Sequence, residues 1–262
     1  MVKKVLLASA ALALFASPGF AADLPVKAPP MPVPVFSWTG LYVGGNVGWG
    51  WGHSVSTELP PGSSAFPTGT VFPRENSNGF LGGAQVGFNY QTAYNLVVGV
   101  EGEWDWTNIR GTETTVSTAP RFVGFSSTTT GRIKDLADLT GRIGWAAGPW
   151  LFYGKGGVAL DQTSSTGVFL SPTGALVDTR TTGTIDRSGW VVGAGFEWAF
   201  APAWSAKIEY EHFDFGSTPI GVSHITTATG AFTQTFVSST EKVDVVKGGI
   251  NYRFNWGAPA TY

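Results

Sequence analysis

The sequence predicts an all-β fold, an eight-stranded antiparallel up-and-down transmembrane β-barrel. Eight segments alternate apolar and polar side chains at period two, as strands with one apolar face do. The connections between these segments are alternately short and long, the pattern of a barrel with short periplasmic turns and long outer loops. Charged residues make up only 13% of the chain, which is low for a surface that faces water throughout. These three observations favour a barrel in a lipid bilayer.

The amino terminus has the pattern of a secretory signal peptide. Two lysines precede an apolar run over 5–16, and small residues stand before a cleavage site predicted after Ala21. The run is too short to cross roughly 30 Å of hydrocarbon, so we predict a signal peptide over 1–21. Residues 22–35 hold five prolines and are predicted to form a Pro-rich periplasmic tether. A peptidoglycan contact there is an alternative to a simple spacer.

The predicted barrel covers 36–256 and is followed by a short C-terminal tail over 257–262. Its first three strands are predicted over 38–51, 79–90 and 96–106. The third is the clearest, because Glu101, Glu103 and Asp105 alternate with valines and tryptophans. Three carboxylates on one face cannot lie in hydrocarbon, so the opposite, apolar face is predicted to contact lipid.

Five further segments repeat this alternation, and their spans are 135–147, 150–160, 186–200, 204–215 and 243–254. In the last of them, Ile250, Tyr252 and Phe254 share one face. Two alternate aromatic residues at the end of an apolar face are typical of a strand that ends at a lipid interface.

The connections indicate how the strands are ordered. Tight turns rich in turn-forming residues are predicted at 92–95, 148–149 and 201–203. The long connections are 53–78, 108–131, 163–184 and 216–241. With short turns in the periplasm, both termini are predicted to be periplasmic. Some long loops are expected to continue as hairpins above the membrane, for instance around 228–230.

Two stretches carry a resemblance to a known family. The stretch from Trp38 to Trp49, WTGLYVGGNVGW, and the stretch from Gly249 to Phe254, GINYRF, resemble the small porin-like, RopB-like outer-membrane β-barrel proteins of alphaproteobacteria. The resemblance covers essentially the whole chain after the signal peptide. It implies an outer-membrane barrel of a family that is commonly labelled porin, and that is similar in size to barrels serving as envelope structure and surface antigens.

The last predicted strand also resembles the closing-strand signal of bacterial outer-membrane barrels. The matching residues are Lys247, Gly249, Tyr252 and Phe254. In that family Phe is often the final residue, whereas eight residues follow it here. The resemblance implies recognition by the barrel-assembly machinery.

Charged residues are predicted to line the lumen. They are Glu101, Glu103, Asp105, Asp138, Glu197, Glu209, Glu211, Arg142, Lys155, Arg187, Lys207, Lys247 and Arg253. Eight strands enclose an interior that side chains can just fill, so a plug of ion pairs is favoured over a narrow ion path. Inward glycines, among them Gly87 and Gly195, would leave some room for a path.

No enzyme or cofactor site is predicted. The chain has no cysteine, which excludes disulfides and thiolate metal sites. A lipid-modifying hydrolase built on His53 and Ser54, or on His212, is a weak alternative, as is binding of haem or metal by His53, His212 or His224. The histidines are not spaced as ligands on one element. The net charge of −2 argues against a nucleic-acid partner.

The sequence therefore predicts a protein of the Gram-negative cell outer membrane with a structural and surface-exposed role in the envelope. The alternative is a small-solute porin with a narrow charged lumen. Expected partners are outer-membrane lipid and the assembly machinery, with peptidoglycan or host-surface contacts left open.

Overall fold

The computed structural model describes residues 36–62, 66–118 and 120–254. The predicted signal peptide, the tether and the C-terminal tail lie outside these residues. The strands are β1 Gly40–Glu58, β2 Glu75–Gln91, β3 Leu96–Thr107, β4 Arg110–Val116, β5 Ser126–Ala147, β6 Trp150–Leu170, β7 Leu176–Ala201, β8 Trp204–Thr226 and β9 Phe232–Phe254. The described part of the chain contains no helix long and apolar enough to cross a bilayer.

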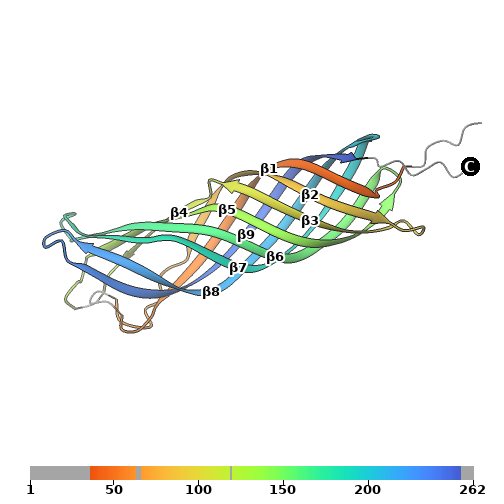
Figure 1. Cartoon of the computed structure of the whole chain (residues 1–262). Helices are drawn as coiled ribbons and strands as arrows, with labels where there is room; N and C mark the ends of the chain where they lie inside the picture. Colours follow the sequence, from red (N-terminus) through yellow and green to blue (C-terminus); the bar gives the residue numbers. More distant parts are fainter. Residues whose placement is uncertain (1–35, 63–65, 119, 255–262) are drawn as a thin grey trace, which may run out of the picture. The chain divides into compact units, whose positions relative to one another are not determined.

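Eight of these strands form a closed antiparallel ring in the order β1, β9, β8, β7, β6, β5, β3, β2, and pairing of β2 with β1 closes it. The predicted eight-stranded up-and-down barrel is thereby confirmed. The ninth strand, β4, prolongs β3 after a two-residue break and pairs with both β2 and β5. Figure 1 shows the strands running obliquely past one another around the ring.

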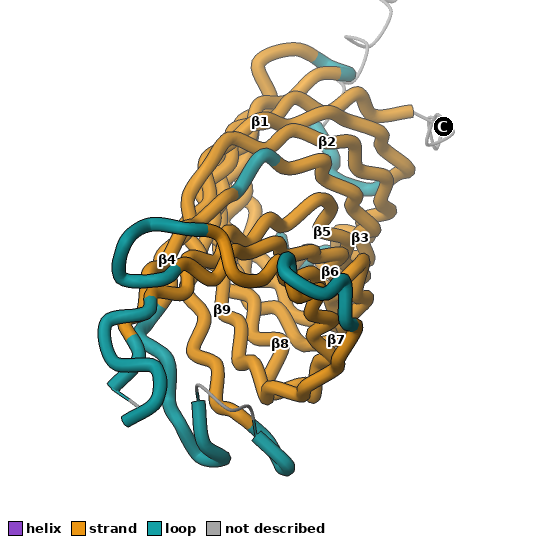
Figure 2. Tube along the Cα trace, turned by 90° about the vertical axis from the view of Figure 1, so that its left-hand side faces the viewer, coloured by secondary structure: helices purple, strands orange, loops and turns teal. Residues whose placement is uncertain are grey.

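The strands extend much further at the long-loop end than the sequence predicts. At the short-turn end the observed and predicted limits agree within two residues, but β7 begins at Leu176 instead of 186 and β8 ends at Thr226 instead of 215. The connections at that end shrink to 59–74, 117–125, 171–175 and 227–231. The predicted hairpin near 228–230 is confirmed, and Figure 2 shows the longer loops gathered at one end of the barrel.

The long strand extensions escape period-two analysis for a physical reason. They are rich in threonine, which fits a β-strand well, but their apolar residues are divided between the two faces, with Ile220 and Val237 facing inward and Ile225 and Phe236 exposed. Thr112 pairs with Thr130 and Thr114 with Thr128 across β4 and β5, with their hydroxyl groups hydrogen-bonded on the outer wall. A strand with polar side chains on both faces shows no alternation of hydrophobicity, although its backbone ladder is complete.

The outer wall beside the short turns is apolar and aromatic. Nine of the eleven tryptophans are 40–62% exposed on it: Trp49, Trp51, Trp104, Trp106, Trp145, Trp150, Trp190, Trp198 and Trp204. They lie towards the two ends of the apolar stretches, with valine, leucine, isoleucine and phenylalanine between them. An apolar band flanked by aromatic girdles is the lipid-facing surface of a transmembrane barrel.

Candidate functional site: the filled lumen and its vestibule

The interior of the barrel is built in layers along its axis. Nearest the short turns lies the turn-side apolar layer, formed by Trp38, Val97, Ala146, Leu151, Tyr153 and Ala199. Then comes a charged layer. Above it lies the loop-side apolar layer, formed by Leu81, Ile109, Ile133, Leu136, Ala159, Val191, Phe213, Phe215, Val243 and Val245. Strand β6, for example, presents Leu151, Lys155 and Ala159 to the three layers in turn.

The charged layer is one connected network centred on Lys155 of β6. The Lys155 ammonium lies 2.5 Å from Glu211, 3.1 Å from Glu101 and 3.1 Å from Glu209. It also lies 3.7 Å from a carboxylate oxygen of Glu103. Period-two geometry explains the cluster, because alternate residues of β3 and β8 project into the lumen. None of these side chains has measurable exposure to solvent.

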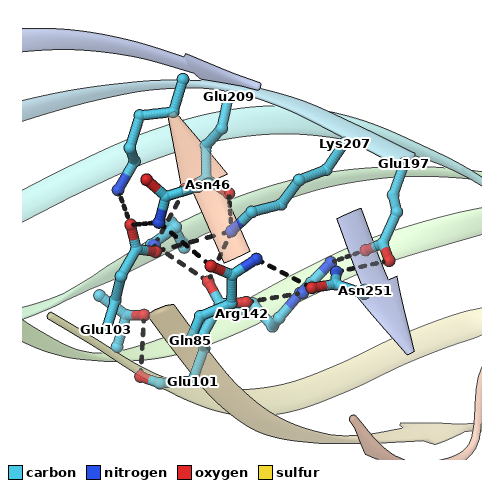
Figure 3. A network of polar contacts seen from close by, with 12 residues as sticks. Asn46, Gln85, Glu101, Glu103, Arg142, Glu197, Lys207, Glu209 and Asn251 are labelled. Atoms are coloured by element: carbon cyan, nitrogen blue, oxygen red, sulfur yellow. Dashed lines mark hydrogen bonds and ion pairs between the residues drawn. The ribbon is translucent and has the colours of Figure 1, made fainter. Parts of the chain in front are cut away.

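Two further ammonium groups bridge the carboxylates of β3 and β8, and Figure 3 shows the first of them, Lys207, between Glu101 and Glu209. Lys207 Nζ lies 3.5 Å from Glu101 and 3.6 Å from Glu209. Lys247 Nζ contacts Glu103 and lies 3.3 Å from Asp105 and 2.5 Å from Glu211. Each lysine therefore joins carboxylates of different strands, which ties opposite parts of the ring together.

Arg142 of β5 completes the layer on its short-turn side. Its guanidinium lies 3.0 Å from Glu197 and 3.4 Å from Glu101, and its Cζ lies 3.9 Å from the centroid of the Tyr153 ring. Tyr42 donates a hydrogen bond of 2.7 Å to Glu101 and accepts one of 2.8 Å from Arg142. Cation–π packing and charge-assisted hydrogen bonds hold this buried arginine.

Eleven of the thirteen predicted lumen charges join this network. The other two do not: Arg187 lies beyond the loop-side apolar layer, 2.6 Å from Asp161, and Arg253 packs 4.7 Å from the Trp38 ring centroid and donates to the Ser37 and Pro202 carbonyls. The thirteen predicted charges comprise seven acids and six bases, but the charged layer itself holds seven carboxyl groups and four cations.

Neutral side chains that the sequence analysis omits from the network supply the remaining hydrogen bonds. Asn46 donates to Glu103 at 2.9 Å and to Gln85 at 3.1 Å. Gln85 donates to Asn251 at 2.9 Å, and Asn251 donates to Glu197 at 2.8 Å. These amides stand at inward positions of β1, β2 and β9, so alternation alone could have identified them. Their partners could not be identified without the register.

The inward glycines leave no open room beside the charges, contrary to the expectation that they would favour a path. A Cβ atom at Gly87 would clash with the Tyr42 hydroxyl, and one at Gly195 would approach the Tyr153 hydroxyl to 2.8 Å. At Gly44 the Asn251 side chain occupies the corresponding space. Each glycine accommodates a large side chain from a neighbouring strand, which explains how so many long side chains fit into one narrow lumen.

Two sets of three carboxyl groups are close enough to bind a metal ion: Glu101, Glu103 and Glu209, and Glu103, Asp138 and Glu211. Ammonium groups already lie among them, however, because Lys155 contacts all five of these residues. A metal ion placed there would be repelled by Lys155. The carboxylates are better explained as partners of lysine than as metal ligands.

The predicted histidine candidates are held in separate polar contacts. His212 lies 2.7 Å from Asp244 on the outer wall, and His224 lies 2.9 Å from Asp178 in the strand extensions. Ser54 lines the interior above the loop-side apolar layer, whereas period two places its neighbour His53 on the opposite face of β1. The pairing of His53 with Ser54 therefore does not form.

Above the loop-side apolar layer the strand extensions enclose a cavity of about 140 Å³, here called the vestibule. Polar and apolar side chains line it in similar measure. The polar ones include Ser54, Ser56, Glu75, Glu113, Arg180, Arg187, His224 and Glu241, and the apolar ones include Phe72, Ile185, Ile220, Val222 and Val237. Its floor includes Ile133 of the loop-side apolar layer. The vestibule therefore faces the charged layer across an apolar barrier.

Glu241 in the vestibule should make stability depend on pH. Trp51, the last outward tryptophan of β1, pairs with Asp244 of β9. Glu241 lies three residues further from the short turns than Asp244, and therefore outside the lipid-facing band. Burial raises the pKa of Glu241 from 4.5 to about 7, although Arg187 opposes this and Asp161 and Glu75 add to it. Because the folded-state pKa exceeds the unfolded value, stability should fall as pH rises from about 4.5 to about 7.

We expect Glu241→Gln to remove this loss. Chemical denaturation should show the variant more stable than the wild type by up to roughly 3 kcal/mol at pH 8, and equal to it near pH 4. The control Asp186→Asn, on the outer wall beside Gln162, should change stability by less than about 0.5 kcal/mol at either pH. A variant that is less stable than the wild type at pH 8 would show that ionised Glu241 stabilises the fold through Arg187.

A closed antiparallel ring with a lipid-facing aromatic band and a charged interior defines a transmembrane β-barrel of the outer-membrane class. The family model described as outer membrane protein beta-barrel domain matches residues 7–254. The chain belongs to that family, as the resemblance of its first and last strands implies.

Two relatives match over nearly the whole chain. The 31 kDa outer-membrane immunogenic protein of Brucella melitensis is 31% identical over 268 residues, covering 97% of this chain and 100% of the relative. The 25 kDa outer-membrane immunogenic protein of the same species is 25% identical over 258 residues, covering 97% and 99%. These matches support the predicted kinship with small outer-membrane proteins of alphaproteobacteria, and the protein is an outer-membrane protein.

A solved structure supports the fold. The outer membrane protease OmpT of Escherichia coli superposes with a TM-score of 0.54 at 7% sequence identity, over 84% of this chain and 98% of OmpT. At that identity the likeness concerns the architecture of the barrel alone.

Proposed function

We propose that this protein is a closed, non-conducting barrel that serves the architecture of the outer membrane and displays its strand extensions at the cell surface. The observation that carries the proposal is the layered filling of the lumen. Lys155, Lys207 and Lys247 have no exposed side-chain surface, and apolar layers lie on both sides of them. An ion that crossed the barrel would have to lose its hydration water at each of the two apolar layers, which is costly.

The test is conductance of the protein in a planar bilayer, after gel mobility with and without boiling has shown a closed barrel. We expect no defined current steps, for the wild type or for Lys207→Gln. A porin with a narrow charged lumen would instead give salt-dependent steps whose ion selectivity changes with Lys207→Gln or Glu209→Gln. Such steps would contradict the proposal and support the porin alternative.

The surface role rests on the strand extensions. β5 to β9 each continue about ten residues beyond the lipid-facing band, and loops 59–74 and 117–125 join this outer part. Two relatives are named outer-membrane immunogenic proteins, which supports exposure of this part to other cells. Replacing loop residues without changing charge should alter recognition by surface-binding antibodies while gel mobility stays unchanged.

Orientation and assembly complete the proposal. Both termini would lie in the periplasm, because the short turns are at the same end as Phe36 and Phe254. Tyr252 and Phe254 face outward with ring centroids 5.1 Å apart, which would present an aromatic edge to the barrel-assembly machinery. The tether would act as a spacer, with peptidoglycan as its alternative contact. We propose no enzymatic activity, since Ser54 lines the vestibule while His53 lies on the opposite face of β1.

A further inference from the structure

The outer wall of the strand extensions carries a pair of arginines, Arg110 on β4 and Arg132 on β5. They are direct register partners across the β4–β5 ladder, and both are exposed. Their chain neighbours Gly111 and Ile133 are buried, so alternation along the strands places the two arginine side chains on the outside. Two guanidinium groups therefore start from adjacent positions on the outer wall.

The pair has no carboxylate of its own. Within the described residues neither Arg110 nor Arg132 takes part in an ion pair. The ladder neighbours of the pair are Asn78 on β2, opposite Arg110, and Ser164 on β6, opposite Arg132. Like charges directly opposite each other destabilise a strand pair. An anion bound between Arg110 and Arg132 would remove this repulsion, and the described part of the protein supplies none.

The far side of the barrel is different. On β8 and β9, Lys242 lies 2.9 Å from Asp214 and His212 lies 2.7 Å from Asp244. Lys242, the cation on that side, is thus paired within the protein. Arg110 and Arg132 therefore differ from this outer-wall lysine in having no ion-pair partner among the described residues.

The height of the pair matches the headgroup region of a bilayer. Arg110 lies four residues beyond Trp106, the last outward tryptophan of β3. At about 3.3 Å per residue and a strand tilt near 40°, this is roughly 10 Å above the aromatic girdle. Arginine side chains can extend several ångströms back along the wall, so their guanidinium groups can reach lipid headgroups.

We propose that Arg110 and Arg132 bind a phosphate group of a lipid headgroup in the outer leaflet. Each guanidinium can form two parallel hydrogen bonds with phosphate oxygens, and the shared anion removes the repulsion between the two cations. Asn78 and Ser164 flank the phosphate with an amide and a hydroxyl. A lipid phosphate is favoured over free phosphate because Trp104 and Trp106 offer an apolar wall for acyl chains below the pair.

The proposal is tested with the protein purified from outer membranes into a zwitterionic detergent. Binding of bis-phosphorylated lipid A, and of the same lipid after its phosphates are removed, is measured by native mass spectrometry. We expect Arg110→Gln/Arg132→Gln to weaken binding of the phosphorylated lipid about 30-fold. The dephosphorylated lipid should bind wild type and variant equally weakly. Arg110→Lys/Arg132→Lys should be intermediate, because lysine keeps the charge but not the paired hydrogen bonds.

Lys242→Gln is the matched control, since it removes an outer-wall cation that already has a carboxylate partner. Its affinity for the phosphorylated lipid should stay within about twofold of wild type. Unchanged binding by Arg110→Gln/Arg132→Gln, or an equal loss in Lys242→Gln, would overturn the proposal. Inorganic phosphate that displaces the lipid at the lipid's own concentration would also overturn it, in favour of a site for free phosphate.

Discussion

Replacing Lys155 with methionine is expected to cost about 3 to 5 kcal/mol of unfolding free energy, the usual loss when one partner of a buried ionic cluster is removed. Methionine retains most of the volume, so the effect is electrostatic. Lys155 lies 2.5 Å from Glu211, as Lys247 also does, and it contacts Glu101 and Glu209 as well. Without it, buried carboxylates would face one another with fewer cations. The measurement is urea unfolding of the folded protein in detergent or lipid.

Two controls make this result decisive. Lys242→Met breaks a pair in which the lysine side chain is 40% exposed and should cost no more than about 1 kcal/mol. Adding Glu211→Gln to Lys155→Met should recover part of the loss, because it removes one of the uncompensated carboxylates. If Lys155→Met costs as little as Lys242→Met, water must reach the charged layer, and the lumen is an open path instead of a plug.

Replacing Trp38 with alanine is expected to cost about 3 to 5 kcal/mol, the usual range for a fully buried tryptophan. The side chain is completely buried in the turn-side apolar layer. It packs edge-on against Phe36 at 5.2 Å between ring centroids, and its indole N–H donates to the Gly148 carbonyl at 3.3 Å. Its removal would leave a cavity beneath the charged layer. Thermal or urea unfolding measures the loss.

Trp150→Ala is the matched control for this substitution. Trp150 lies on the outer wall, 40% exposed, and stacks on Trp198 with ring centroids 5.7 Å apart. Lipid can fill the space that it leaves, so we expect a loss of only about 1 kcal/mol, the value of the aromatic pair. Equal losses for the two variants would show that the turn-side layer contributes no more to stability than the girdle does.

The membrane-spanning part of the fold could be predicted from the sequence because the outer face of the barrel wall contacts lipid and the inner face contacts polar side chains. Leu96, Val98 and Val100 meet lipid, while Glu101 and Glu103 meet the interior, so alternation along β3 is strong. The same logic placed eleven charges in the lumen. It failed for the extensions of β4 to β9, where water outside and a vestibule of mixed polarity inside place polar side chains on both faces of the strands.

The contacts between side chains in the lumen depend on the register and stagger of neighbouring strands, which cannot be read from the sequence of one strand alone. The sequence by itself determined the number of membrane strands, which faces meet lipid, and the presence of buried charge, because these follow from period two and from loop length. Only the tertiary structure decided that Arg187 and Arg253 leave the network and that Tyr42 fills the space at Gly87. It also showed that apolar layers cover the charges on both sides. The reason is that these contacts join residues of different strands, whose relative heights are set when the ring closes.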